Sequence, residues 1–271
     1  MNLLDSFILG LIQGLTEFLP VSSSGHLVLG ESLLIGNYHQ KLLFEVVTNF
    51  GTLCSILVYY RSRIVDIIYS WINIPRSSQP FSEQWQTDPN LKLTWLIIIS
   101  MIPAAIVGFM FKDTIQAYFL NPFMVCIMLM ITGSMLFSTR FLKSFSNKVH
   151  PGSALLIGIA QAFAILPGIS RSGSTISAGL HLGIKRKELA NFSFLMVIPV
   201  SVGAMLLEVK DLVAAGATMH GAETLVIGFV TSFISGYYAL KYLIYMLQHK
   251  GIYPFAWYCW AVGIAGLIYF W

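Results

Sequence analysis

The chain alternates long apolar runs with short polar breaks. Six of the runs are long enough to cross a bilayer core of about 30 Å, which needs about 20 helical residues. They cover approximately residues 42–60, 92–111, 122–141, 189–208, 223–246 and 254–271. Because each run suits a membrane-spanning helix, the pattern predicts an all-α polytopic membrane protein.

Two further apolar segments are interrupted at their centres. Residues 3–35 are broken at Pro20, and residues 153–184 are broken at Pro167 and Gly168. Each half has about 12 to 15 residues, or about 20 Å of helix, and is too short to span a membrane alone. We expect two re-entrant helix-turn-helix hairpins, whose broken backbone must be buried in protein or line a cavity.

The broken segments belong to an internal repeat. Gln13 and Phe44 recur as Gln161 and Phe192, which are 148 positions further on. We therefore expect one membrane domain over residues 1–271, built from a repeat at about 1–145 and a second at about 150–271. Each repeat has one hairpin and three spans, and an odd number of spans turns the second repeat upside down, which predicts an inverted-topology repeat.

Composition agrees with a membrane protein. Apolar residues make up 56% of the chain and charged residues only 10%, against about 25% in soluble domains, and mean hydropathy is +0.74. The three cysteines are too few and too scattered for a metal site or a disulfide framework. The first residues have no basic region, so we expect no removable signal peptide.

The basic residues predict the orientation. If both termini share one face, that face holds Lys41, Lys112 and Lys210. The opposite face holds twelve: Arg61, Arg63, Arg76, Lys92, Arg140, Lys143, Lys148, Lys185, Arg186, Lys187, Lys241 and Lys250. This imbalance predicts that the basic face is cytoplasmic and that both termini lie outside. The net charge of +4 therefore reflects topology, and we expect no nucleic-acid partner.

The polar residues at the breaks indicate an anion site. Ser22 follows Pro20, and Ser170 and Ser172 follow Pro167, where each is a candidate cap for the next half-helix. If the two hairpins meet near the midplane, two half-helix N-termini face one cavity, and such termini attract phosphate. Arg171 adds a planar cation that holds phosphate oxygens in pairs, and Thr175 adds a hydroxyl.

The first break also holds acid–base chemistry. Glu17 precedes it and His26 follows it, and Ser23 shares a helical face with His26. These residues fit either a Ser23 nucleophile activated by His26 or direct attack by His26 on phosphorus. Glu17 beside a phosphate suggests a divalent-cation ligand or a partner that orients His26. A purely structural cluster of caps explains this coincidence poorly.

At these residues the chain resembles the undecaprenyl-diphosphatase family, also called bacitracin-resistance proteins. The first family motif is a Glu or Gln, then Glu four residues later, then Phe-Leu-Pro-Val-Ser-Ser-x-Gly-His, and it matches Gln13, Glu17 and 18–26. The second, Pro-Gly-x-Ser-Arg-Ser-x-x-Thr, matches 167–175. The similarity extends along essentially the whole chain.

The resemblance implies a metal-dependent membrane enzyme of the bacterial cytoplasmic membrane. It would hydrolyse undecaprenyl diphosphate to undecaprenyl phosphate and inorganic phosphate, which recycles the lipid carrier of peptidoglycan synthesis and confers bacitracin resistance. It also implies magnesium or calcium as cofactor and a site opening to the outer face. By motif position, the implied catalytic residues are Glu17, Ser23, His26 and Arg171, with Glu17 as metal ligand. The implied substrate-binding residues are Gln13, Ser22, Ser170, Ser172 and Thr175.

A secondary transporter or lipid flippase is the main alternative, because inverted repeats with paired hairpins are typical of transporters. That alternative needs no general base and leaves His26 unexplained. A non-catalytic membrane scaffold accounts poorly for Arg171. Membrane lipid is an expected partner in each case, and the oligomeric state, including a homo-oligomer, stays open.

Overall fold

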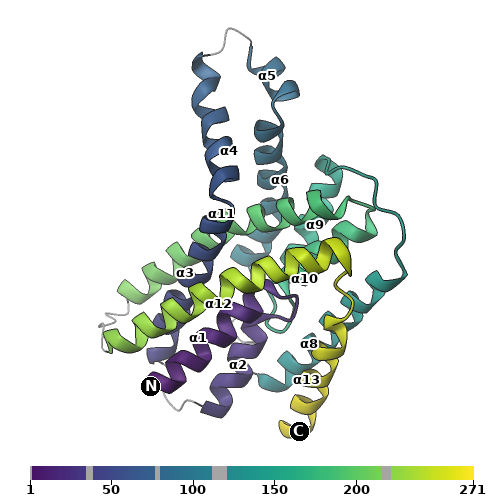
Figure 1. Cartoon of the computed structure of the whole chain (residues 1–271). Helices are drawn as coiled ribbons and strands as arrows, with labels where there is room; N and C mark the ends of the chain where they lie inside the picture. The colour runs from purple at the N-terminus through teal and green to yellow at the C-terminus, as the bar shows by residue number, and fades with distance from the viewer. Residues whose placement is uncertain (1, 35–38, 77–79, 112–120, 215–220) are drawn as a thin grey trace.

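The computed structural model describes residues 2–34, 39–76, 80–111, 121–214 and 221–271, and its elements are helical apart from one isolated β-bridge between Asn147 and Ile184 (Figure 1). The predicted first repeat holds α1 (Leu3–Phe18), α2 (Ser23–Leu34), α3 (His39–Tyr59), α4 (Arg61–Asn73), α5 (Phe81–Thr87), α6 (Pro89–Met110) and α8 (Pro122–Ser138). The second holds α9 (Pro151–Phe163), α10 (Arg171–His181), α11 (Arg186–Ala214), α12 (Ala222–His249) and α13 (Phe255–Tyr269). Single 3-10 turns cover Ile74–Arg76 and Thr139–Phe141. The all-α class is confirmed.

In the part of the chain that the structure describes, four helices are long and apolar enough to span a membrane, namely α6, α8 with its following turn, α11 and α12. The predicted spans at 92–111, 122–141, 189–208 and 223–246 are thereby confirmed. The other two differ from the prediction. Residues 43–59 of α3 form a fifth candidate only together with α4, from which they are bent by 74°. Helix α13 has 15 residues, about 22 Å, because it starts after Pro254 and ends at Tyr269.

Both predicted breaks are confirmed. Helix α1 ends at Phe18 and α2 begins at Ser23, while α9 ends at Phe163 and α10 begins at Arg171. In each case the two half-helices pack against each other as a hairpin. Ser22 and Gly168 adopt left-handed backbone conformations, with φ of 69° and 93°, which turn the chain sharply after each proline.

The two hairpin turns touch each other. A methyl group added at Gly25, in the first turn of α2, would lie 3.0 Å from the Cα atom of Gly168. The backbones of the two turns are therefore in close contact at Gly25, where a side chain would be tightly crowded. The expected meeting of the two breaks is therefore confirmed, and their polar residues lie around one point.

Small residues place α1 against α12. A Cβ atom at Gly10 would lie 2.8 Å from the carbonyl oxygen of Gly228, and one at Gly14 would collide with the hydroxyl of Ser235. Spacing small residues four apart lets membrane helices approach closely. This contact fixes the rotation of α1 and with it the direction of its polar residues.

The main apolar core lies beside the first break. Phe18 is 2% exposed, and its ring packs edge-on against Phe194 of α11 with centroids 6.3 Å apart. Phe194 also packs against Tyr60 at the end of α3. The last residue of α1 is therefore anchored by elements of both repeats, immediately after Glu17.

The order of elements repeats, with a broken hairpin followed by long helices in each half. Figure 1 places both chain ends toward the lower edge of the view and α4 and α5 at the upper edge. The inversion of the second repeat and the repeat boundaries stay predictions. Of the three basic residues assigned to the terminal face, Lys112 lies outside the described residues.

Replacing Gly168 with alanine is expected to lower the apparent melting temperature in detergent by about 5–10 °C. The new methyl group would lie 2.5 Å from the carbonyl oxygen of Val125 and 2.7 Å from Cβ of Met128, in a left-handed conformation that disfavours alanine. The matched control is Gly203→Ala on α11, where no atom lies within 4 Å of the new group. A fall of similar size in the control would show that the turn is not specifically tight.

Candidate active site

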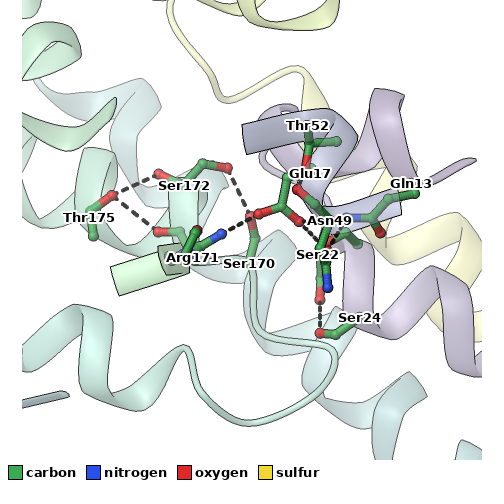
Figure 2. Close-up of polar contacts among 12 residues, drawn as sticks. Gln13, Glu17, Ser22, Ser24, Asn49, Thr52, Ser170, Arg171, Ser172 and Thr175 are labelled. Atoms are coloured by element: carbon green, nitrogen blue, oxygen red, sulfur yellow. Dashed lines mark hydrogen bonds and ion pairs between the residues drawn. The ribbon is translucent and has the colours of Figure 1, made fainter. Parts of the chain in front are cut away.

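Glu17 lies at the centre of a polar cluster between the two hairpins (Figure 2). One carboxylate oxygen forms an ion pair with the guanidinium of Arg171. The other accepts hydrogen bonds from Ser23 Oγ at 2.5 Å and from Gln13 Nε2 at 3.1 Å. The Glu17 side chain is 11% exposed and that of Arg171 is 25% exposed, so the pair is only partly shielded from solvent.

Helical spacing accounts for the Gln13–Glu17 contact, because residues four apart lie on the same face of α1. The Gln13 amide also donates to Oδ1 of Asn49 on α3, at 2.6 Å. Asn49 was not among the predicted site residues. The sequence does contain a signal for Asn49, because it is the single side-chain amide in the apolar run at 42–60. Such a group needs a polar partner within the membrane.

Arg171 is the first residue of α10, where the helix dipole is positive. A cation at that end is unfavourable by itself, and the carboxylate of Glu17 offsets it. A second guanidinium nitrogen donates to Ser201 Oγ at 3.2 Å. The Arg171 side chain therefore extends from the second hairpin to the Glu17 carboxylate of the first hairpin. The N-terminus of α10 and the guanidinium together attract anions.

Three hydroxyls of the second hairpin form hydrogen bonds with backbone groups. Ser170 Oγ caps α10 by accepting from the amide of Gly173 at 3.1 Å. Ser172 Oγ lies 3.4 Å from the carbonyl oxygen of Leu19, to which it donates, and so links the two hairpins. Thr175 donates within α10 to the carbonyl of Arg171 at 3.1 Å. All three side chains are buried.

Thr132 of α8 clamps the second turn. Its buried hydroxyl donates to the carbonyl of Gly168 at 2.9 Å and accepts from the amide of Ser170 at 3.1 Å. Two backbone groups of a non-helical turn are thus satisfied away from water. The sequence alone could not reveal this role. A single threonine in an apolar helix can equally donate its hydroxyl to the backbone carbonyl four residues earlier in the same helix.

The first turn is organised around Ser22. Its hydroxyl accepts from the amide of Gly25 at 3.3 Å and lies 3.3 Å from the hydroxyl of Ser24. Its carbonyl oxygen contacts Nδ1 of His26 at 2.8 Å. The contacts of Ser22 therefore stabilise the backbone of the first turn, while the side chain of Ser23 points to Glu17.

His26 has partners other than those expected from helical spacing. Its Nε2 atom lies 2.9 Å from the hydroxyl of Tyr258 on α13, and the two rings are parallel within 8°. Ser23, which shares the helix with His26, donates instead to Glu17. The predicted Ser23–His26 pair is replaced here by a Ser23–Glu17 pair, because tertiary contacts from α1 and α13 compete for the two side chains.

The site offers few oxygen ligands for a hard divalent cation. Among the described residues, no three His, Cys, Asp or Glu side chains cluster as a metal site. Glu17 supplies a carboxylate, however, and Oε1 of Gln13 is buried without a hydrogen-bond partner in the part of the chain that the structure describes. Magnesium typically binds to one or two carboxylates together with substrate phosphates and water. The donor set is compatible with such a site.

The fold and the site together define a helical polytopic membrane protein with a partly buried Ser–Glu–Arg cluster where two broken hairpins meet. The chain belongs to the family described as bacitracin resistance protein BacA, whose model matches residues 6–265.

Curated relatives are similar over nearly their whole length. The undecaprenyl-diphosphatase of Desulfatibacillum aliphaticivorans is 39% identical over 275 residues, which cover 99% of each chain. That of Halothermothrix orenii is 39% identical over 271 residues, covering 99% of this chain and 98% of the relative. That of Methanobrevibacter smithii is 36% identical over 270 residues, covering 97% and 96%.

Proposed function

We propose that this protein hydrolyses undecaprenyl diphosphate to undecaprenyl phosphate and inorganic phosphate. The observation that carries the proposal is the Glu17 carboxylate held between Ser23 of one hairpin and Arg171 of the other. A hydroxyl, a proton acceptor and a guanidinium at facing half-helix ends are the groups that phosphoryl transfer needs. The relatives that carry the name undecaprenyl-diphosphatase match almost the whole chain, which supports the same function.

In this proposal, Arg171 binds the terminal phosphate. When the diphosphate enters, the guanidinium exchanges part of its contact with Glu17 for phosphate oxygens, which it holds with paired hydrogen bonds. The N-terminus of α10 faces the same anion. Both groups stabilise the charge that spreads over the phosphoryl oxygens in the transition state.

Ser23 is the proposed nucleophile. Its Oγ attacks the terminal phosphorus while its proton passes to the Glu17 oxygen that accepts its hydrogen bond at 2.5 Å. The bond between that phosphorus and the bridging oxygen breaks, and undecaprenyl phosphate leaves with the bond electrons. Water then attacks the phosphoserine and releases inorganic phosphate, with His26 as the proposed acid–base group. Direct attack by His26 or by water on the substrate is the alternative.

Glu17 and Gln13 would hold a divalent cation through their side-chain oxygens. Magnesium or calcium supplies charge neutralisation at the phosphate oxygens when bound. In its presence Gln13 keeps the carboxylate oriented through the contact with Asn49. Because one carboxylate is a weak site, we expect the cation to bind mainly together with the diphosphate.

An apolar groove of about 470 Å³ suits the prenyl chain. It lies between α6 and the end of α9, and its lining includes Pro103, Ile106, Phe163 and Leu166. Leu166 lies in the break between α9 and α10, two residues before Gly168, so the groove reaches the second turn. The tail would leave sideways along it into the bilayer of the cytoplasmic membrane, with both termini outside and the site opening to the outer face.

The test is phosphate release from undecaprenyl diphosphate by the purified full-length protein in detergent, with and without chelator. We expect release by the untreated protein, loss after chelation and recovery with added magnesium or calcium. Tight binding or vesicle-to-vesicle movement of the lipid without phosphate release would favour the transporter alternative. Release that is insensitive to a strong chelator would refute the cation requirement.

A further inference from the structure

Tyr258 is the residue of α13 that reaches the first hairpin's imidazole. Its hydroxyl lies 2.9 Å from Nε2 of His26, and the ring centroids are 5.5 Å apart with an interplanar angle of 8°. Tyr258 is 46% exposed, so it is not a core residue packed on every side. The contact joins residues 232 positions apart in the chain.

The tautomer of the neutral imidazole follows from its other partner. Nδ1 of His26 lies 2.8 Å from the carbonyl oxygen of Ser22, and a carbonyl oxygen can only accept. Nδ1 therefore carries the proton in the neutral ring, which leaves the lone pair on Nε2. The Tyr258 hydroxyl donates to that lone pair. Both ring nitrogens are thus engaged, one by the backbone of the first turn and one by a side chain of α13.

A second contact shows that α13 supports this turn as a whole. The thiol of Cys259 lies 3.8 Å from the carbonyl oxygen of Pro20, to which it donates, and is fully buried. Helix α13 is itself packed along α8, where Gly133 leaves space for the ring of Trp260. Because α8 clamps the other turn through Thr132, one packed helix pair contacts both breaks.

We propose that Tyr258 is a positioning residue for His26, which directs the Nε2 lone pair through its hydroxyl until substrate or water takes its place. The proposal rests on the proposed function, in which His26 serves as the acid–base group. A base is effective when a third group fixes its orientation, because imidazole otherwise rotates about its broad terminal torsion. The backbone of Ser22 fixes the tautomer, and Tyr258 fixes the direction.

Tyr258→Phe separates positioning from packing, because it removes the hydroxyl and keeps the ring. With undecaprenyl diphosphate as substrate, we expect kcat to fall about 5- to 10-fold with KM changed less than about twofold. Tyr258→Leu, which loses both the hydrogen bond and the ring stacking, should have a still lower kcat. Tyr269→Phe is the matched control, since this tyrosine lies on the same helix and is 69% exposed, and it should retain wild-type kinetics.

A chemical readout on His26 tests the contact without relying on activity. Diethyl pyrocarbonate acylates the free imidazole lone pair, and peptide mass spectrometry follows the reaction at His26 separately from the other histidines. We expect Tyr258→Phe to raise the rate of acylation at His26 several-fold, whether or not the protein releases phosphate. Wild-type acylation in Tyr258→Phe would overturn the contact. Faster acylation with unchanged kcat would overturn the positioning role while leaving the proposed phosphatase function intact.

Discussion

Replacing Arg171 with alanine is expected to reduce phosphate release from undecaprenyl diphosphate by about 10³-fold or more, as for the loss of an arginine that stabilises a phosphoryl transition state. The guanidinium approaches the reacting group from the second hairpin, and α10 begins at the same residue. Arg171→Lys keeps the charge and loses the paired geometry, so it should retain more activity than alanine. Colorimetric phosphate release by purified variants measures the effect.

Loss of stability must be separated from loss of catalysis in this variant. Arg171→Ala leaves Glu17 without its counter-ion at 11% exposure, which destabilises the fold. Adding Glu17→Gln in the same chain removes that charge, and we expect it to restore the melting temperature without restoring activity. Arg140→Ala controls for a general loss of positive charge and should be close to wild type. Full hydrolysis by folded Arg171→Ala would refute the proposed site.

Replacing Ser23 with alanine is expected to lower phosphate release by about 10³-fold or more, because no other hydroxyl takes the place of a lost nucleophile. The matched control is Ser24→Ala, one residue further along α2, whose hydroxyl lies 3.3 Å from Ser22 Oγ. That variant should stay within about threefold of wild type, since neutral surface or turn hydroxyls contribute little. Steady-state assays at saturating substrate compare the two.

The proposed intermediate gives the Ser23 prediction a second measurement. Acid quenching during turnover of substrate labelled with ³²P at the terminal phosphate, followed by peptide mapping, should place the label on Ser23. Acid-labile label on His26 would indicate attack by the imidazole. An active Ser23→Ala variant would exclude Ser23 as the nucleophile and leave attack by His26 or water.

Glu17 connects the predictions for Arg171 and Ser23, because its carboxylate contacts both side chains. From sequence spacing, Ser23 and His26 form the natural acid–base pair. In the fold, α1 brings the carboxylate to Ser23, and α13 brings a phenol to His26. In the proposed mechanism, Glu17 therefore takes the first proton and His26 serves the hydrolysis step.

Sequence and tertiary structure determined different parts of this protein. Apolar run lengths, the prolines at 20 and 167 and the repeated polar breaks by themselves indicate a helical membrane protein with two hairpins, because membrane thickness and backbone hydrogen bonding impose strict local rules. The same motifs predict Glu17, Ser23 and Arg171 as site residues, and the fold brings their side chains together. Run length alone overestimated α13, because the apolar run continues to the last residue while the helix ends at Tyr269.

Only the tertiary structure could decide which polar groups meet. Asn49, Thr132 and Tyr258 lie on three helices far apart in the chain, and each contacts a hairpin turn or its polar residues. Single polar residues in apolar helices look alike in a sequence, since their role depends on which face another helix covers. Helix packing through small residues selects that face, so the partners of Glu17 and His26 follow from the fold and not from their spacing.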